Sequence, residues 1–168
     1  FVFPLICFLI LSTGQNNFTK LPVLTNNLID VSEISDKKNL TFKENVSVVC
    51  FLGEDISKSK TRLLNLNEKI YKKFLDFKQF QIIAIYPKEK EAEVEKLKTE
   101  IGAFTDMQKW IFVPSEKELI QVFFKSFSTD IILDNYSSSK AFIIDKNGNL
   151  RGRTDDKDIA NGKLYGNN

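Results

Sequence analysis

Runs of apolar residues alternate with charged, periodic segments along this chain, and together they predict alternating strands and helices. Residues 46–52 (VSVVCFL) and 80–86 (FQIIAIY) are almost continuously apolar, as expected for strands covered on both faces of a sheet. Between them, apolar residues recur at steps of three and four, which predicts a helix that buries one stripe and is capped by Ser57 or Ser59. The predicted stripe is Leu63, Leu66, Ile70, Phe74 and Phe77.

A second helix, a strand and a third helix follow. Residues 89–101 predict a charged helix with Gly102 as its C-cap, and residues 110–113 predict a short strand. Ser115 and Glu118 have the spacing of a capping box at the start of the next helix. The apolar side predicted for that helix is Leu119, Ile120, Phe123, Phe124 and Phe127.

The order of these elements predicts the fold class once the last hairpin is included. Residues 141–145 and 149–154 predict two antiparallel strands joined by the turn Lys146-Asn147-Gly148. A βαβ first half followed by a hairpin places a mixed central sheet between helices on both faces. We therefore predict an α/β protein with a thioredoxin-like fold.

The predicted hairpin has an apolar face, with Phe142 and Ile144 or Ile143, that needs a cover. Residues 155–168 are too polar and too rich in glycine to provide it. We therefore expect the natural chain to continue into an amphipathic helix, so that the thioredoxin-like domain, residues 46–168, is truncated at its C-terminus.

The start of the chain differs in character from the rest, because residues 1–12 (FVFPLICFLILS) carry no charge. A span of a bilayer needs about 20 apolar residues, so residues 1–14 predict part of a signal peptide or membrane anchor. An N-terminal core strand or helix is the alternative interpretation. The polar residues that follow predict a tether and an extended segment over residues 15–45. Export from the cytoplasm is the expected consequence.

Composition and charge argue against several classes of function. The 168 residues include 24 Lys and Arg against 22 Asp and Glu, and this net charge of +2 gives no support to nucleic-acid binding. The chain contains no histidine, and its two cysteines are Cys7 in the apolar leader and Cys50 inside residues 46–52. A thiol inside an apolar strand is expected to be buried and inert.

Three passages carry a resemblance to a known family over residues 46–152. Residues 109–115 (KWIFVPS) lead into a helix, and residues 141–152 combine a strand with an Asp-x-x-Gly turn and an Arg-Gly exit. In the first half, a strand, a polar turn and a Leu-rich helix precede a strand that ends at Pro87. These passages are similar to the Sco/SenC family, membrane-anchored thioredoxin-like proteins that deliver copper to cytochrome c oxidase. The resemblance implies a domain on the periplasmic side of a bacterial cell membrane.

The chain departs from this family where the family's chemistry lies. The Cys-x-x-x-Cys-Pro motif would fall within residues 55–60, and Tyr86 replaces the family's Asp before Pro. Copper(I) prefers soft ligands, which the residues at these positions do not supply. We therefore expect no catalytic residue, no metal ligand and no cofactor. With a one-residue uncertainty in alignment, the thiol positions of the lost site are Asp55, Ile56, Ser59 and Lys60, and its histidine would fall at Tyr136 or Ser137.

Two arrangements of acidic residues offer other chemistry. Glu54 and Asp55 could form a carboxylate pair for acid–base catalysis, but the lysines beside them favour a solvated charged turn. Asp134 with Asp145, or residues 155–158 (DDKD), could bind calcium. The DDKD run lacks the glycine and the terminal glutamate of a calcium loop, which favours a solvated segment.

The leading hypothesis from the sequence is a non-enzymatic, membrane-tethered Sco-like module of the bacterial envelope that has lost its metal site and binds or assembles other proteins. Its partner would be an envelope protein or a respiratory-complex assembly protein, with no role for nucleic acid. The alternative is an active Sco-type copper chaperone or thiol–disulfide redox protein for cytochrome c oxidase assembly. A truncated fragment with no separate function is compatible with either.

Overall fold

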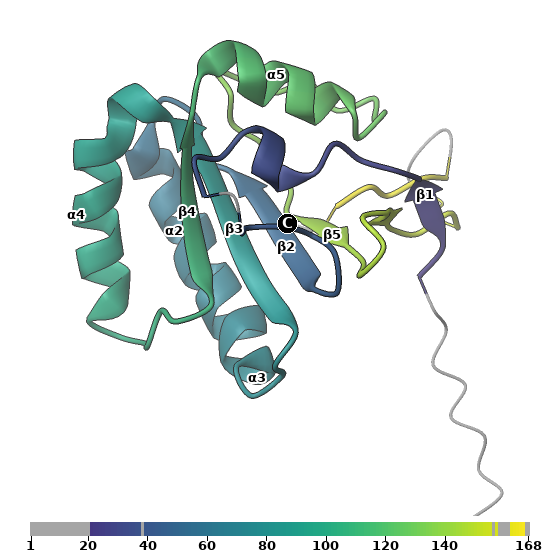
Figure 1. The fold of residues 1–168 in the computed structure, drawn as a ribbon. Coiled ribbons are helices and arrows are strands. Elements are labelled where there is room, and N and C mark those ends of the chain that lie inside the picture. Colours follow the sequence, from purple (N-terminus) through teal and green to yellow (C-terminus); the bar gives the residue numbers. More distant parts are fainter. Residues whose placement is uncertain (1–20, 38, 156, 158–161, 167–168) are drawn as a thin grey trace, which may run out of the picture.

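A mixed six-stranded sheet organises the protein in a computed structural model that describes residues 21–37, 39–155, 157 and 162–166 (Figure 1). The strand order is β1-β6-β5-β2-β3-β4. The strands are β1 (Val23–Thr25), β2 (Val46–Phe51), β3 (Phe80–Pro87), β4 (Trp110–Ser115), β5 (Phe142–Ile144) and β6 (Leu150–Arg151). The helices are η1 (Val31–Glu33), α2 (Ile56–Leu66), η2 (Asn67–Tyr71), α3 (Lys72–Phe74), η3 (Lys88–Lys90), α4 (Glu91–Gly102) and α5 (Lys117–Lys125).

β2 lies inside the sheet, as its apolar run predicts. It pairs in parallel with β3 and antiparallel with β5, and β3 pairs in parallel with β4. β5, β6 and β1 form the antiparallel half of the sheet. Because β2 and β3 have neighbours on both sides and packed layers on both faces, nearly all of their residues are buried. The predicted mixed sheet with helices on both faces is confirmed.

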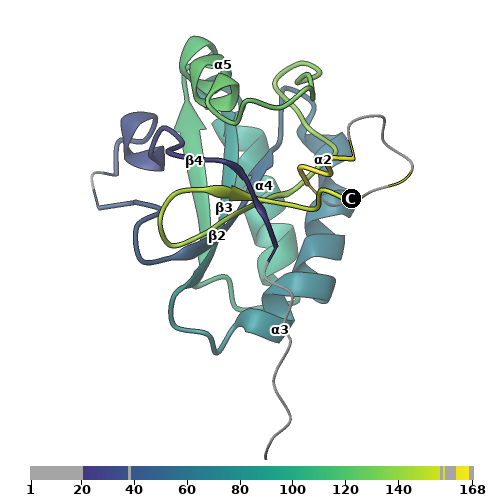
Figure 2. The ribbon, with the colours of Figure 1, turned by 90° about the vertical axis from the view of Figure 1, so that its right-hand side faces the viewer.

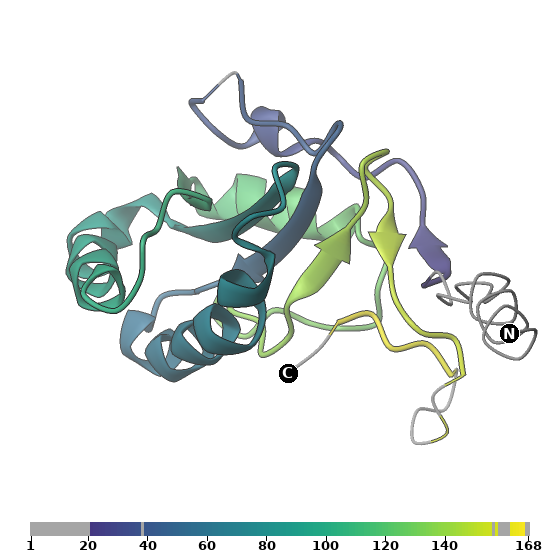
Figure 3. The same ribbon diagram turned by 90° about the horizontal axis from the view of Figure 1, so that it is seen from below.

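Alternate residues of β2, β3 and β4 enter two separate apolar cores, one on each face of the sheet. Figures 2 and 3 show the helices on both faces of this sheet. On one face, α5 packs together with η1 and the segment that leads to β2. On the opposite face, α4 and the helix formed by α2, η2 and α3 cover β2, β3 and β4. The first core is centred on Phe51, whose ring contacts those of Phe123, Phe124, Phe127 and Phe142.

The helix that follows β2 buries a different stripe from the one predicted. A π-helical turn, η2, holds more residues per turn than an α-helical turn, so it rotates the later residues away from the α-helical stripe. Ile70 within this turn is only half-buried, and so is Leu66, which precedes the turn. Phe74 and Phe77, predicted to face the core, are 48% and 45% exposed. The residues that the helix buries are Ile56, Ser59, Leu63, Asn67 and Tyr71.

The N-terminal cap of α2 also differs from the prediction. Asp55, and neither Ser57 nor Ser59, is the N-cap, because its carboxylate accepts a hydrogen bond from the backbone amide of Lys58. The Ser57 hydroxyl donates to the same carboxylate over 2.6 Å. Ser59 does not cap the helix, and its side chain belongs to the buried face of α2.

The ends of α4 and α5 are corrected in the same way. Gly102 is the last residue of α4 and Ala103 is its C-cap. Ser115 remains in β4, so Glu116 is the N-cap of α5 and the predicted capping box does not form. Leu119, predicted to face the core, is 42% exposed. The other four residues predicted for the apolar side, Ile120, Phe123, Phe124 and Phe127, are buried.

The apolar residues of the C-terminal hairpin lie on both faces of the sheet. Phe142 and Ile144 are fully buried in the core beneath α5. Ile143 points to the opposite face and is only half-buried. Tyr165 is 7% exposed and packs into the first core, so the expectation that residues 155–168 provide no cover is wrong for this residue. The continuation of the natural chain remains a prediction.

Residues 21–45 add to the sheet and to the first core. β1 pairs with β6, and the side chains of Val31 and Phe42 are 0% and 1% exposed. The Asp30 carboxylate links two parts of this segment, because it accepts hydrogen bonds from the Phe42 amide and the Thr41 hydroxyl. The predicted leader, residues 1–14, lies outside the described residues, and within the described ranges no helix is long and apolar enough to cross a membrane.

Candidate functional site

The turn after β2, where the sequence places the lost site, lies against the loop that precedes β5. Gly53 has a φ of 74°, and a Cβ on it would lie 2.5 Å from Ser137 Cβ and 2.7 Å from the Asn135 carbonyl oxygen. The Glu54 amide donates to that same carbonyl over 3.1 Å. Glycine therefore permits both the left-handed conformation and the close approach of the two segments.

The loop itself is a tight turn held by its own backbone. The amides and carbonyls of Asp134 and Ser137 exchange two hydrogen bonds, of 2.8 and 2.9 Å. Asn135 and Tyr136 between them have φ angles of 46° and 63°. Two successive left-handed residues are typical of a two-residue hairpin turn. This turn carries both residues at the predicted histidine position to the end of β2.

Arg62 joins the two segments. Its Nη2 donates hydrogen bonds to Ser59 Oγ at 2.8 Å and to the Phe51 carbonyl at 3.1 Å, and lies 3.4 Å from Ser137 Oγ. The Ser59 hydroxyl donates to the Leu52 carbonyl over 2.8 Å and is 1% exposed. Burial lowers the pKa of the Arg62 guanidinium. The structure thus brings together two of the six positions assigned to the lost site, with a half-buried cation between them.

The other four assigned positions take no part in this contact. Asp55 caps α2 and pairs with Lys58 over 3.2 Å. Ile56 is 3% exposed and belongs to the second core. Lys60 forms an ion pair of 2.6 Å with Glu100 of α4. The ring of Tyr136 lies under the ammonium group of Lys117, 5.7 Å from ring centre to Nζ.

The charged residues of the turn are engaged in ion pairs at the surface. Glu54 pairs with Lys117 over 2.5 Å, and this hydrogen bond and charge lower the pKa of the Glu54 carboxyl and raise that of the Lys117 ammonium. The hydroxyl of Ser57 lowers the pKa of Asp55. Glu54 and Asp55 therefore serve separate partners, which argues against the carboxylate pair considered from the sequence.

Asp145, considered together with Asp134 for calcium binding, has another role in the structure. The Asp145 carboxylate pairs with Arg151 and accepts hydrogen bonds from the Asn147 and Asn149 amides in the hairpin turn. Asp156 and Asp158 of the DDKD run lie outside the described residues. Within residues 21–37, 39–155, 157 and 162–166, no three His, Cys, Asp or Glu side chains gather as a metal ion would require.

Cys50 is buried beside this region, as predicted. It is 1% exposed, and its Sγ lies 3.6 Å from the Ile83 carbonyl. Desolvation raises the pKa of the Cys50 thiol to about 12, although the charge of Arg62 acts in the opposite direction. Tyr86, which the resemblance places at the family's Asp position, is 1% exposed, and burial raises its pKa to about 12 as well. Neither group is ionised at neutral pH.

Sequence reasoning missed Arg62, which holds the site together. The signal available was an arginine three residues after Ser59 in a helix whose other basic residues are lysines. Arginine presents several donors in a rigid plane and is suited to bridging partly buried acceptors, whereas lysine is a flexible point charge. The pairing with the loop at Ser137 had no signal in the helix itself, because the two residues are 75 positions apart.

Comparison with known proteins finds similarity only at the level of structure. No protein-family model matches the chain, and a search of curated proteins finds no match. A solved structure of BsSco, a member of the Sco family of cytochrome c oxidase assembly proteins, is similar over 79% of this chain and 85% of its own, with a TM-score of 0.54 and 14% identity.

Two further solved structures are similar over most of their length. One is the thioredoxin domain of a thiol-disulfide oxidoreductase from Bacteroides vulgatus, with 20% identity, coverage of 79% of this chain and 84% of its own, and a TM-score of 0.48. The other is a thiol:disulfide interchange protein from Bacteroides sp., with 18% identity, coverage of 78% and 76%, and a TM-score of 0.48. Together with the mixed sheet, the likeness to BsSco confirms that this chain has a thioredoxin-like α/β fold.

Proposed function

We propose that this chain is a Sco-like, thioredoxin-fold module of the bacterial envelope that binds or assembles other proteins without catalysing a reaction. The observation that carries the proposal is the contact of Arg62 with Ser59 and Ser137. A guanidinium and two hydroxyls occupy the place where the resemblance puts a thiol and a histidine of the Sco/SenC site.

These groups are unsuited to the family's chemistry. Hydroxyl oxygens are hard ligands, whereas copper(I) prefers sulfur and imidazole. The guanidinium stays protonated at neutral pH and disfavours a second cation within hydrogen-bond distance. Thiol–disulfide exchange needs an accessible thiolate, which the Ser59 and Ser137 hydroxyls cannot provide.

The alternative function, an active copper chaperone or thiol–disulfide redox protein, would have to use Cys50 or Cys7. Cys50 is 1% exposed and has a pKa of about 12, so its thiolate is scarce and inaccessible. Cys7 belongs to residues 1–14, which we propose to tether the module to the membrane. A binding role for the folded domain therefore has better support than a redox role.

Titration with copper(I) tests the proposal. The chain is mixed with a chromophoric copper(I) chelator at pH 7, and we expect it to remove no copper from a chelator that a Sco-type dithiol site would outcompete. A Cys7→Ser variant, measured in parallel, separates binding by the folded domain from binding by the leader. One equivalent of copper retained by the Cys7→Ser protein would overturn the proposal. So would catalytic turnover in an insulin reduction assay.

A further inference from the structure

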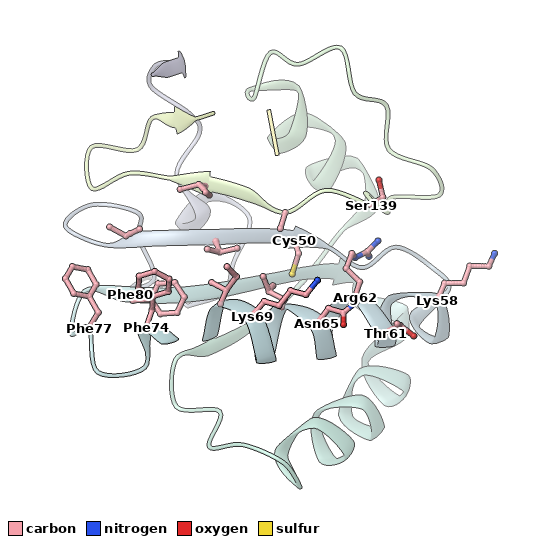
Figure 4. A pocket seen from close by; sticks show the side chains of 16 residues that line it. Cys50, Lys58, Thr61, Arg62, Asn65, Lys69, Phe74, Phe77, Phe80 and Ser139 are labelled. Atoms are coloured by element: carbon pink, nitrogen blue, oxygen red, sulfur yellow. The ribbon is translucent and has the colours of Figure 1, made fainter. Parts of the chain in front are cut away.

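A large apolar groove opens between the helix that follows β2 and the edge of the second core (Figure 4). Its volume is about 1060 Å³. One wall is formed by Leu66, Ile70 and Phe74 of the helix and by Phe77 in the turn after it, side chains that are half-buried or exposed. The floor is formed by β2 and the segment of β5, through Val46, Val48, Ala141 and Ile143.

The groove leaves a considerable apolar surface in contact with water. Phe74 and Phe77 are 48% and 45% exposed, and Val46 and Ile143 are only half-buried. Contiguous apolar surface of this kind on a soluble domain marks a site of interaction. Figure 4 shows the aromatic side chains gathered at one end of the groove, and Arg62 and Ser139 at the other end.

The charged residues that line the groove are all positive. Its charged lining residues are Lys58, Arg62 and Lys69, and among the described residues no Asp or Glu lines it. Lys58 is already paired with Asp55, but Lys69 has no ion pair with any described residue. Figure 4 shows the Lys69 ammonium group lying over the groove between the helix and the strands. An occupant with negative charge along its edge would complement this arrangement.

We infer that the groove binds an amphipathic helix of a partner protein that carries acidic residues along the edge of its apolar face. This inference rests on the proposed binding function and names the class of partner. The apolar face would lie on Val48 and Ile143 and contact the exposed ring of Phe74, as in helix-in-groove recognition. An acidic residue at its edge would pair with Lys69.

A labelled peptide tests the inference on the full chain. The peptide has about 18 residues, or five helical turns, with Leu at helical spacing on one face and Glu at both edges of that face. Its partner peptide keeps the Leu face and replaces each Glu by Lys. By fluorescence anisotropy, we expect the Glu peptide to bind in the micromolar range and the Lys peptide to bind at least about tenfold more weakly, since several like-charge contacts replace opposite-charge ones.

Variants locate the bound peptide. Phe74→Ser is expected to weaken binding of the Glu peptide by about fivefold or more, because an aromatic apolar contact is lost. Lys69→Glu is expected to weaken the Glu peptide and strengthen the Lys peptide by about two- to fivefold, the size of an exposed ion pair. Val122→Ser on α5 is the matched control: Val122 is 53% exposed, lies outside the groove and should leave binding unchanged.

Several results would overturn the inference. They are absence of binding, equal binding of the two peptides, and loss of binding in the Val122→Ser control to the same degree as in Phe74→Ser. All three substitutions fall on exposed side chains, so each variant is checked for an unchanged circular dichroism spectrum before use. Copper retention in the titration above would reject the proposed function without affecting these peptide results, so the two failures can be distinguished.

Other occupants of the groove give different outcomes, each of which would also overturn the inference. A second copy of the chain would give a concentration-dependent dimer in sedimentation that Phe74→Ser abolishes. A membrane would give binding to anionic phosphatidylglycerol vesicles in preference to the Glu peptide. A longer natural chain whose own added helix occupies the groove would lose peptide binding relative to the 168-residue chain.

Discussion

The guanidinium Nη2 of Arg62 donates a hydrogen bond of 2.8 Å to Ser59 Oγ, one helical turn before it. Because Arg62 also reaches the Phe51 carbonyl and lies near Ser137, this single side chain connects α2, the end of β2 and the loop before β5. Ser59 and Ser137, which the resemblance places at the family's site, thus have a structural role, in which their hydroxyls and Arg62 Nη2 hydrogen-bond at the end of the central strand.

Removal of this cation should destabilise the domain. In Arg62→Ala, the Phe51 carbonyl and the Ser59 hydroxyl lose a charged donor but keep the Ser138 amide and the Leu52 carbonyl as partners, so the loss is that of hydrogen bonds to a charged group, about 1.5–3 kcal/mol. We expect the free energy of unfolding in urea to fall by that amount. Lys60→Ala, which removes only the surface pair with Glu100, should cost about 0–1 kcal/mol. Equal urea midpoints for Arg62→Ala and the unchanged chain would contradict the structural role of Arg62.

Alanine substitutions at two glycines with nearly the same φ angle can separate the cost of the left-handed backbone conformation from the cost of a steric clash. Gly53 and Gly148 have φ angles of 74° and 75°. A Cβ on Gly53 would meet Ser137 Cβ at 2.5 Å, whereas a Cβ on Gly148 meets nothing within 4 Å. Gly148→Ala should therefore cost about 1–2 kcal/mol, the penalty of the left-handed region. Gly53→Ala should cost about 1–3 kcal/mol more, because the loop at Ser137 must also move.

Thermal or urea unfolding of the two variants measures this difference directly. If Gly53→Ala and Gly148→Ala unfold at the same urea concentration, the turn after β2 does not lie against the loop before β5. The contact between the two segments would then have to be revised, and with it the placement of Ser137 beside Arg62.

The strands and the fold class could be predicted from the sequence because burial on both faces leaves a simple pattern. Residues 46–52 and 80–86 are apolar at nearly every position, and both form interior strands. The helix after β2 shows where this reasoning fails. The stripe from Leu63 to Phe77 follows α-helical periodicity, but the chain forms the π turn η2 and buries Tyr71 instead, with its hydroxyl accepting a hydrogen bond from the Lys109 amide.

Local sequence also failed to predict which polar residues make long-range contacts. Ser59 was assigned a capping role because serine favours helix N-termini, yet its hydroxyl is buried against the Leu52 carbonyl. The approach of Ser137 depends on the path of the chain through α5 and its following loop. Such contacts between distant segments are set by the tertiary fold, and the spacing of residues within α2 carries no information about them.

Burial of two acidic groups predicts a loss of stability at alkaline pH. The pKa of Cys50 is raised from 9.0 to about 12 and that of Tyr86 from 10.0 to about 12. A raised pKa in the folded state stabilises the fold at pH values below the unfolded pKa, and this stabilisation is lost as pH rises towards the folded pKa. We expect the free energy of unfolding to be insensitive to these groups up to pH 9 and to decline between pH 9 and 12.

The reactivity of Cys50 checks the same burial independently. In a Cys7→Ser background, the shift from 9.0 to about 12 reduces the thiolate fraction by about a thousandfold at pH 8, and burial adds a barrier to access. Native protein should therefore react with a chromogenic disulfide reagent at least about a thousandfold more slowly than protein in 8 M urea. Comparable rates in the two conditions would mean that Cys50 is exposed.

Introducing two thiols and a histidine should discriminate between the two possible alignments of this chain with the Sco/SenC motif. A Cys-x-x-x-Cys pair falls either at Asp55 and Ser59 or at Ile56 and Lys60. Ser59 lies beside the loop at Ser137, whereas Ile56 is buried in the second core and Lys60 points to Glu100. We therefore expect the triple variant Asp55→Cys, Ser59→Cys, Ser137→His to gain copper(I) binding in chelator competition, because soft ligands replace hydroxyls and a carboxylate.

The matched control for this gain is Ile56→Cys, Lys60→Cys, Ser137→His, which installs the same three ligand types in the other alignment. Its first thiol would lie in the core and its second on the side of α4, so the three groups should not converge on one ion. Because Arg62 would lie close to a copper ion at the first site, adding Arg62→Met to the first triple variant should tighten its binding by removing a like charge. Stronger copper binding by the control than by the first variant would place the lost site one residue later in α2 and would remove Ser59 from it.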